Sequence, residues 1–124
     1  MKFYLCEGCG KMAVIFRPSK CPTKCCGEPM KEVEIGSSDG ALEKHVPDVT
    51  VDGSLVTVKV GSTAHPMLEA HYIEWIILET NRGFQKKDLA PGDAPEAVFA
   101  LAPGEVPVTA YESCNLHGIW KKDI

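Results

Sequence analysis

The sequence has no long apolar run and no excess of positive charge, and both absences narrow what the protein can be. None of its stretches is apolar enough to cross a membrane, so we do not expect a membrane protein. The 17 acidic residues outnumber the 13 basic ones, which gives a formal net charge of −4. Because nucleic-acid phosphates bind basic surfaces, this balance argues against a nucleic-acid partner.

The amino terminus also lacks the sustained apolar stretch and small-residue cleavage site of a secretory signal. We therefore expect a cytoplasmic protein. In that reducing compartment, clustered cysteines are better explained as metal ligands than as disulfides. A small disulfide-bonded domain is the alternative.

Cysteine is almost confined to the start of the chain, because five of the six precede Ser37. The polar stretch Ser37 to Gly40 is typical of a linker. The sequence therefore predicts two domains, residues 1–36 and 37–124. Chains below roughly 40 residues rarely bury a sufficient core. The first domain should therefore need a metal or another form of stabilisation, such as disulfides or a partner.

The first domain contains two pairs of cysteines, Cys6 with Cys9 and Cys25 with Cys26. Four thiolates suit a tetrahedral iron or zinc ion. Iron would allow one-electron transfer, whereas zinc would be structural only, and the residues do not separate the two. Cys21 adds a fifth thiol that could replace Cys25 or Cys26, but we expect it to lie outside the site.

Short runs of β-type residues dominate the chain, separated by turn residues such as Asp52-Gly53 and Pro91-Gly92. The expected strands are residues 11–16 and 31–35 in the first domain, then 46–51, 55–60, 71–80, 84–89, 96–101 and 106–112. Short strands separated by turns in this way predict a β-sandwich in the second domain. Val56, Val58 and Val60 recur with period two and should share a buried face. No stretch shows convincing helical periodicity, although Met67 to Ala70 could form a single turn.

Histidine is scarce, and its few positions are informative. The chain has four histidines, which are His45, His65, His71 and His117. A single histidine is more often an ordinary surface or core residue than a ligand. Cys114 and His117, however, stand three positions apart, so a tight turn can direct both at one metal ion. We expect all five residues at strand ends, where loops on a rigid sandwich can hold an open site.

Several motifs together match one known family. They are Cys6-x-x-Cys9, Cys25-Cys26-Gly27-Glu28-Pro29-Met30, Glu43-Lys44-His45-Val46-Pro47, His65-Pro66-Met67, His71-Tyr72-Ile73-Glu74-Trp75, Pro91-Gly92-Asp93-Ala94-Pro95 and Cys114-Asn115-Leu116-His117-Gly118. Over nearly its whole length the sequence closely resembles desulfoferrodoxin, the two-iron form of superoxide reductase. Cys21 has no counterpart in that family pattern.

The resemblance implies an all-β protein, with a small rubredoxin- or desulforedoxin-like metal domain followed by an immunoglobulin-like β-sandwich. It implies iron in the four-cysteine site and a second, non-haem iron in the sandwich. The ligands of the second iron would be four equatorial imidazoles and one axial thiolate, from His45, His65, His71, His117 and Cys114. The sixth position would be open in the ferrous state.

The resemblance also assigns roles to two neighbouring charged residues. Glu43 matches the carboxylate that occupies the sixth position in the ferric resting state, and Lys44 matches a basic residue near the substrate path. Without the resemblance, both would be read as solvated surface residues.

The implied activity is one-electron reduction of superoxide to hydrogen peroxide. A rubredoxin-like protein would be the electron donor, and the assembly would be a homodimer. Three alternatives stay open: an electron-transfer metalloprotein without superoxide chemistry, a dismutase that needs no donor, and a zinc-ribbon binding module.

Overall fold

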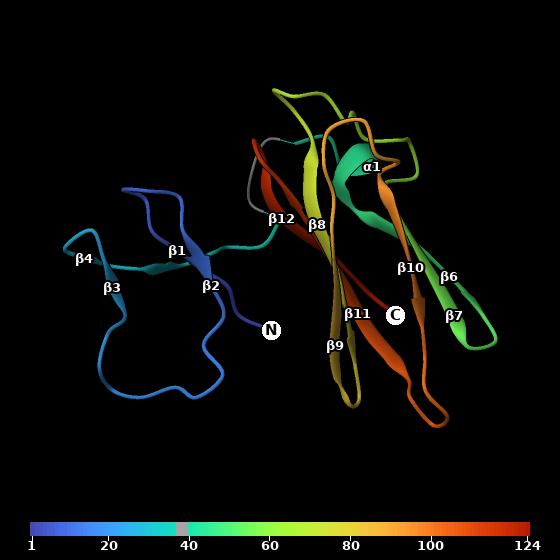
Figure 1. Ribbon diagram of the computed structural model, residues 1–124, viewed down its shortest axis with the longest axis horizontal. Helices are drawn as coiled ribbons and strands as arrows, with labels where there is room; N and C mark the ends of the chain where they lie inside the picture. The colour runs from blue at the N-terminus through green and yellow to red at the C-terminus, as the bar shows by residue number, and fades with distance from the viewer. Residues whose placement is uncertain (37–39) are drawn as a thin grey trace. The chain divides into compact units, whose positions relative to one another are not determined.

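The computed structural model describes residues 1–36 and 40–124, so the predicted linker at Ser37 to Gly40 lies largely outside the described residues. The chain forms two compact units, Met1–Glu34 and Ile35–Ile124 (Figure 1). Within the described part of the chain, no helix combines the length and apolar character needed to span a bilayer.

The first unit is built from very short strands. Its three-stranded sheet has the order β2-β1-β5, from β1 (Tyr4–Leu5), β2 (Met12–Ala13) and β5 (Lys31–Glu32), and β3 (Lys24–Cys25) pairs with β4 (Glu28–Pro29). The strands predicted at 11–16 and 31–35 therefore exist, but each is only two residues long. The remaining backbone consists of turns, bends and irregular segments. Gly10 and Gly27 follow cysteines with φ of 77° and 78°, a conformation that glycine adopts without strain.

The second unit is a sandwich of two antiparallel sheets, which confirms the predicted all-β class (Figure 1). One sheet has the order β10-β7-β6, from β6 (Pro47–Asp52), β7 (Leu55–Val60) and β10 (Glu96–Ala100). The other has the order β12-β11-β8-β9, from β8 (Ile73–Thr80), β9 (Gly83–Asp88), β11 (Pro107–Cys114) and β12 (Gly118–Asp123).

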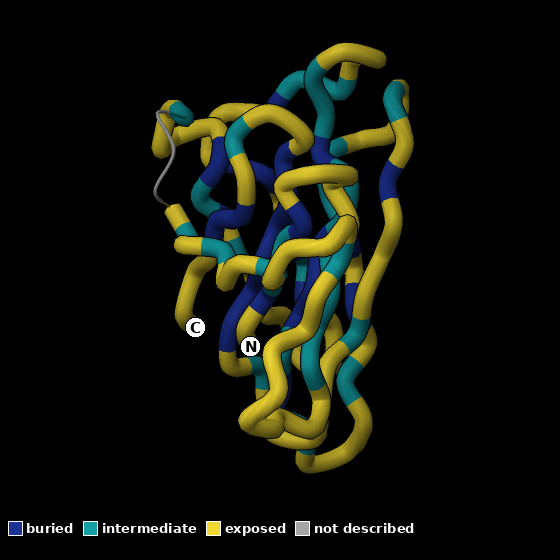
Figure 2. The backbone as a smooth tube through the Cα atoms, turned by 90° about the vertical axis from the view of Figure 1, so that its left-hand side faces the viewer, coloured by how far each residue is buried: buried dark blue, intermediate teal, exposed yellow. Residues whose placement is uncertain are grey.

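The core lies between these sheets. Val56, Val58 and Val60 are 0% exposed, so the buried face predicted for this strand is confirmed. They belong to one apolar cluster with Ile76 and Leu78 of the opposite sheet. Figure 2 shows the buried stretches inside the strands, whereas the connecting loops are largely exposed. Core burial on this scale is what gives a rigid frame to the loops at its ends.

The one helical turn in the described part of the second unit lies at the entry to the sandwich, not at Met67 to Ala70, where the sequence allowed one. Residues Leu42–His45 form a single helical turn, α1. His45 therefore ends a helix instead of opening a strand, and β6 begins only at Pro47. The helix stops there because the residue before a proline disfavours helical backbone, and Val46 is extended with ψ of 122°.

The predicted end of the sandwich was also wrong. The last predicted strand, 106–112, continues to Cys114, and a further strand, β12, follows it. Cys114 and His117 consequently lie in a hairpin between two paired strands, with Gly118 at φ 74° after the turn. The charged run Lys121-Lys122-Asp123 conceals this strand in the sequence, because only Ile119 and Trp120 are buried.

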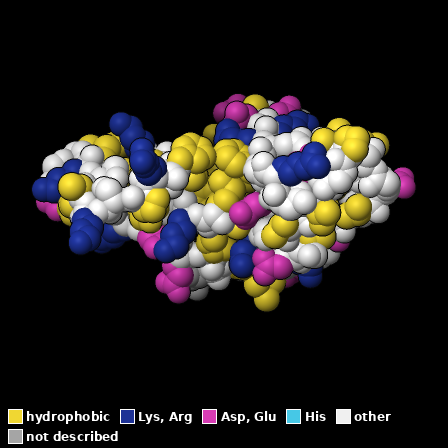
Figure 3. Space-filling model, turned by 90° about the horizontal axis from the view of Figure 1, so that it is seen from below, with side chains coloured by type: hydrophobic (Ala, Val, Ile, Leu, Met, Phe, Trp, Pro, Cys, Tyr) yellow, Lys and Arg dark blue, Asp and Glu magenta, His cyan; other side chains and the backbone are white. Residues whose placement is uncertain are grey.

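Charged side chains of both signs are interspersed on the face shown in Figure 3. Ion pairs of the second unit such as Lys121 with Asp123, at 3.3 Å, join exposed groups. Pairs of this kind contribute at most about 1 kcal/mol each, because water and salt screen them. The stability of the second unit must therefore come mainly from its core.

Candidate metal centres

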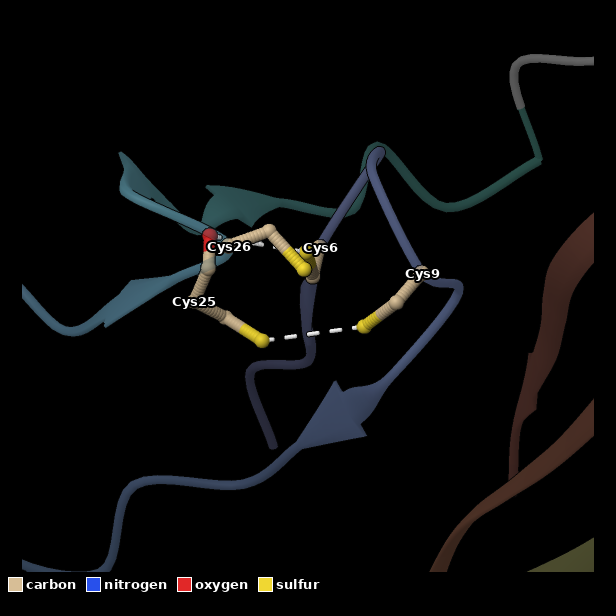
Figure 4. A group of neighbouring side chains, drawn as sticks. All are labelled: Cys6, Cys9, Cys25 and Cys26. Carbon is tan, nitrogen blue, oxygen red and sulfur yellow. Dashed lines mark hydrogen bonds between the residues drawn. The ribbon is translucent and has the colours of Figure 1, made fainter.

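The four cysteines predicted as ligands in the first unit converge. The side chains of Cys6, Cys9, Cys25 and Cys26 point toward one another, and their sulfurs all lie within 4.8 Å of one another (Figure 4). The sulfurs of Cys9 and Cys25 are 3.6 Å apart. Cys21 is exposed and outside this group, as the sequence analysis expected.

The pKa values of these thiols differ from one cysteine to another. Backbone hydrogen bonding at Cys9 lowers the pKa of Cys6 to about 7. Hydrogen bonds with the thiols of Cys9, Cys6 and Cys25 raise the pKa of Cys26 to about 12. Crowded sulfurs cannot all be anionic without a cation between them. A metal ion replaces the protons and satisfies all four, which is the behaviour of a structural or electron-transfer thiolate site.

The second predicted group of ligands converges at one end of the sandwich. His45 ends α1, His65 and His71 lie between β7 and β8, Cys114 ends β11, and His117 lies in the turn before β12. Figure 1 shows α1 and these loops at the same end of the two sheets. Possible ligand atoms of His45, His65, His71 and Cys114 all lie within 4.8 Å of one another.

The four imidazoles form the corners of a square. Successive ring centroids are 4.7 Å apart for His45 and His65, and 4.6 Å for His65 and His71. They are 5.1 Å apart for His71 and His117, and 4.9 Å for His117 and His45. The distance from His45 to His71 is longer, 6.5 Å, as a diagonal must be. The four imidazoles could therefore surround one metal ion.

Two buried histidine nitrogens have lone pairs that a metal ion could bind. The Nδ1 atom of His65 is 2.7 Å from the carbonyl oxygen of Pro66, so it carries the proton as the donor. That tautomer leaves a lone pair on Nε2 of His65. Within the described residues, Nε2 of His65 and Nε2 of His71 are buried without a hydrogen-bond partner. Buried lone pairs without partners fit a metal ion, which would satisfy them.

Burial keeps these histidines neutral. Desolvation, with the charges of the other histidines and of Lys44, lowers the pKa of His45 to about 4. Burial likewise lowers the pKa values of His65 and His71, and the charge of Lys44 contributes to both. Metal binding needs the neutral imidazole, so the ligands compete little with protons at neutral pH.

The thiol of Cys114 approaches the square from inside the sandwich. Cys114 is 2% exposed and belongs to the core cluster, and its sulfur lies 3.7 Å from Nδ1 of His117. Burial raises the pKa of this thiol, while hydrogen bonds from the backbone of Leu116 and His117 oppose the shift. A cation held among the imidazoles would stabilise the thiolate, so Cys114 could serve as its fifth protein ligand.

Sequence reasoning missed Glu112, which lies directly behind His45. Glu112 is 0% exposed, and desolvation, with the charge of Glu74, raises its pKa to about 9. Its Oε1 atom lies 3.4 Å from Nδ1 of His45, at ion-pair distance but without hydrogen-bond alignment. A metal on the other ring nitrogen would make Nδ1 a donor with this acceptor nearby. The signal was present in the sequence, because Glu112 shares the two-residue spacing of Ala110 and Cys114 on a buried strand.

Trp120 was missed as well, and it supports two of the four imidazoles. Its ring stacks on His45 at 5.2 Å and 16°, and its Nε1 donates to the carbonyl oxygen of His117 at 3.0 Å. Gly40 lies close to both of these rings. A methyl group at Gly40 would lie 2.6 Å from Cδ2 of His45, so only glycine fits there.

The two charged residues predicted near the site, Glu43 and Lys44, are exposed on α1 directly before His45. The positive charge of Lys44 reaches three of the imidazoles, since it helps to lower their pKa values.

Fold and donor groups together define a two-unit β-protein with a four-cysteine centre and a separate centre of four histidines and a cysteine. The chain belongs to the desulfoferrodoxin family, whose model matches residues 37–123. The two donor groups correspond to the two iron centres expected for this family.

Known relatives match both units. Desulfoferrodoxin of Nitratidesulfovibrio vulgaris is 47% identical and aligns over 98% of this chain and 95% of its own. A desulfoferrodoxin homolog of Archaeoglobus fulgidus is 43% identical over the same shares. Among solved structures, the superoxide reductase of Treponema pallidum is 42% identical, covers 98% of both chains and has a TM-score of 0.83. A superoxide reductase of Giardia intestinalis, described as 1Fe-SOR, is 32% identical, covers 66% of this chain and 97% of its own, and has a TM-score of 0.56.

We predict that the two centres load independently. Cys9→Ser should remove about one equivalent of metal per chain and leave the histidine centre filled, because each donor group is complete within its own unit. Cys114→Ser should alter the spectrum of the histidine centre and leave the cysteine centre filled. Metal content and visible spectra of both variants check this, and loss of both metals from Cys9→Ser would contradict it.

We also predict that Glu112 strengthens metal binding at the histidine centre. Glu112→Ala should weaken binding about 10- to 100-fold, and Glu112→Gln by less, because the amide keeps an acceptor oxygen beside His45. Competition with a chelator measures both. Glu79→Gln, which alters a glutamate that accepts from the Tyr111 hydroxyl at 2.9 Å, is the control. Equal affinities in all of these variants would show that Glu112 only fills space.

Proposed function

We propose that the protein is a non-haem iron superoxide reductase. Superoxide gains one electron and two protons at the histidine centre and leaves as hydrogen peroxide, and an external donor restores the electron. The observation that carries this proposal is the square of four imidazoles with a buried thiol on one side. Relatives named as superoxide reductases support it.

The donor set distinguishes this centre from a structural site. Structural zinc is almost always held by four protein donors, whereas five are available here. An octahedral ion held by five donors keeps one vertex for a small ligand. Iron bound there supplies the single electron. Neutral imidazoles and one thiolate leave a ferrous site with a net charge of about +1, which attracts an anionic substrate.

The residues at the outer side of the square have complementary roles in this proposal. Lys44 adds positive charge on the approach and draws superoxide to the open vertex. Glu43, its neighbour on the same helical turn, would supply a carboxylate for the remaining position of an oxidised iron ion bound there. Both side chains are exposed, so water can reach the site and supply the protons.

The four-cysteine centre of the first unit suits a different task. It is complete with four sulfurs and offers no position to a substrate. With iron, it would pass single electrons in the manner of rubredoxin, and with zinc it would only hold the unit together. We also propose a rubredoxin-like donor, a homodimer and a cytoplasmic location.

The reaction stoichiometry tests the proposal against its rivals. We expect superoxide consumption to require a reduced donor and to yield an equal amount of hydrogen peroxide without oxygen. A dismutase would return half of the superoxide as oxygen and need no donor. An electron carrier would consume superoxide no faster than its reductant does alone. Simultaneous oxygen-electrode and peroxide assays separate these outcomes.

Lys44→Ala should slow the second-order reaction of the ferrous protein with superoxide about 10- to 100-fold without loss of iron. At a separation of about 6 Å and an effective dielectric near 20, the attraction is at most on the order of 3 kcal/mol, and solvent screening reduces it. The dependence of the rate on ionic strength should weaken in parallel.

Pulse radiolysis at several salt concentrations measures both quantities. Lys87→Ala, on an exposed position of β9, is the charge-matched control. If Lys44→Ala and the control behaved alike, Lys44 would be an ordinary solvated residue.

A further inference from the structure

The helical turn that carries Glu43 and Lys44 cannot hold itself in place. α1 has four residues, and its N-cap residue, Ala41, makes no side-chain capping bond. One turn of helix is unstable alone, because its nucleation cost is not repaid by further hydrogen bonds. The carbonyl of Glu43 would normally accept from the residue four positions on, but that residue is Pro47, which has no N–H.

The turn Gly61-Ser62-Thr63 supplies the missing donors. The backbone N–H of Thr63 donates to the carbonyl oxygen of Glu43 at 2.9 Å, and the hydroxyl of Ser62 donates to the same oxygen at 3.3 Å. Two donors from one turn therefore fix the peptide that joins Glu43 to Lys44.

Gly61 lets the two backbones come this close. It is buried, and a methyl group at this position would lie 2.7 Å from the carbonyl oxygen of Glu43 and 2.9 Å from that of Val46. The same methyl group would lie 3.0 Å from the carbonyl carbon of Lys44. The obstructing atoms all belong to backbone, so no side-chain rotation relieves the contact. Any side chain at Gly61 must push the Glu43–Lys44 segment away.

The turn is itself tied to the core and to a histidine of the metal centre. Val60, at the end of β7, donates to the carbonyl oxygen of Pro95 at 2.8 Å, and His65 donates to the carbonyl oxygen of Val60 at 2.8 Å. The turn therefore relates the position of Glu43 and Lys44 to that of His65.

We propose that residues 61–63 form a seat that sets the reach of Glu43 and Lys44 to the open vertex, with Gly61 as its principal positioning residue. This inference rests on the proposed roles of those two charged residues. It assigns no chemistry to the seat, which touches neither the metal ligands' side chains nor the substrate.

Gly61→Ala is the direct test. We expect the iron content to be unchanged, the superoxide rate to fall about tenfold, and its ionic-strength dependence to weaken, because Lys44 moves from the vertex. Azide should bind the ferric protein more tightly, since Glu43 competes less well for the same position. A merely structural role would lower stability without moving the salt slope or the azide affinity.

Three outcomes separate the seat from the function on which it depends. If Gly61→Ala acts through Lys44, it should add little to the rate loss of Lys44→Ala in the double variant. If Lys44→Ala alone has no effect, the proposed role of Lys44 fails. If Lys44→Ala slows the reaction but Gly61→Ala changes neither rate, salt slope nor azide affinity, the seat is overturned.

One further measurement holds even if Gly61→Ala does not fold. In the wild-type holoprotein, the amide of Thr63 should exchange with solvent at least about tenfold more slowly than that of Gly53 in an exposed turn, because it is bonded to Glu43. Equal exchange would overturn the proposal. Gly40→Ala, which presses on the ring of His45, should instead weaken iron binding, and an effect identical to that of Gly61→Ala would show a general disturbance of the centre.

Discussion

The structure of the second unit depends on burying imidazole nitrogens that the protein itself does not satisfy. Nε2 of His65 and Nε2 of His71 have no hydrogen-bond partner among the described residues. A buried polar group left in this state costs about 1–3 kcal/mol. The sandwich core must hold these groups together until a metal satisfies them. Metal binding and the stability of this end of the sandwich are therefore coupled.

The two centres differ in how much a bound metal contributes to the fold of its unit. In the first unit the four cysteines come from two short knuckles, and the metal closes a unit too small to have a sufficient core. In the second, the core already exists, so the metal need not complete the fold. Its ligands can come from separate loops and leave one side open. The difference in function follows from how much of each fold the metal has to supply.

The sequence predicted the parts of this structure that depend on composition and period. Alternating valines identified the buried face of β7, and the scarcity of histidine made four of them with Cys114 informative. The sequence did not predict α1, because one helical turn has no period and the carbonyl oxygen of Glu43 accepts its hydrogen bonds from residues 62 and 63. Glu112 was missed because charged residues are rarely fully buried, and its place behind His45 depends on the pairing of β11 with β8. Contacts between distant segments were thus beyond local patterns.

The short length of α1 has a structural consequence. In a longer, capped helix before His45, the carbonyl groups would accept hydrogen bonds from within the helix. The helix axis would then set the directions of the side chains. A single turn that ends at Pro47 leaves the carbonyl of Glu43 available, and the β7–β8 loop binds it. The charged pair is then placed by the same loop that carries His65. Because the helical turn is too short to fix its own position, its position depends on the loop that also carries His65.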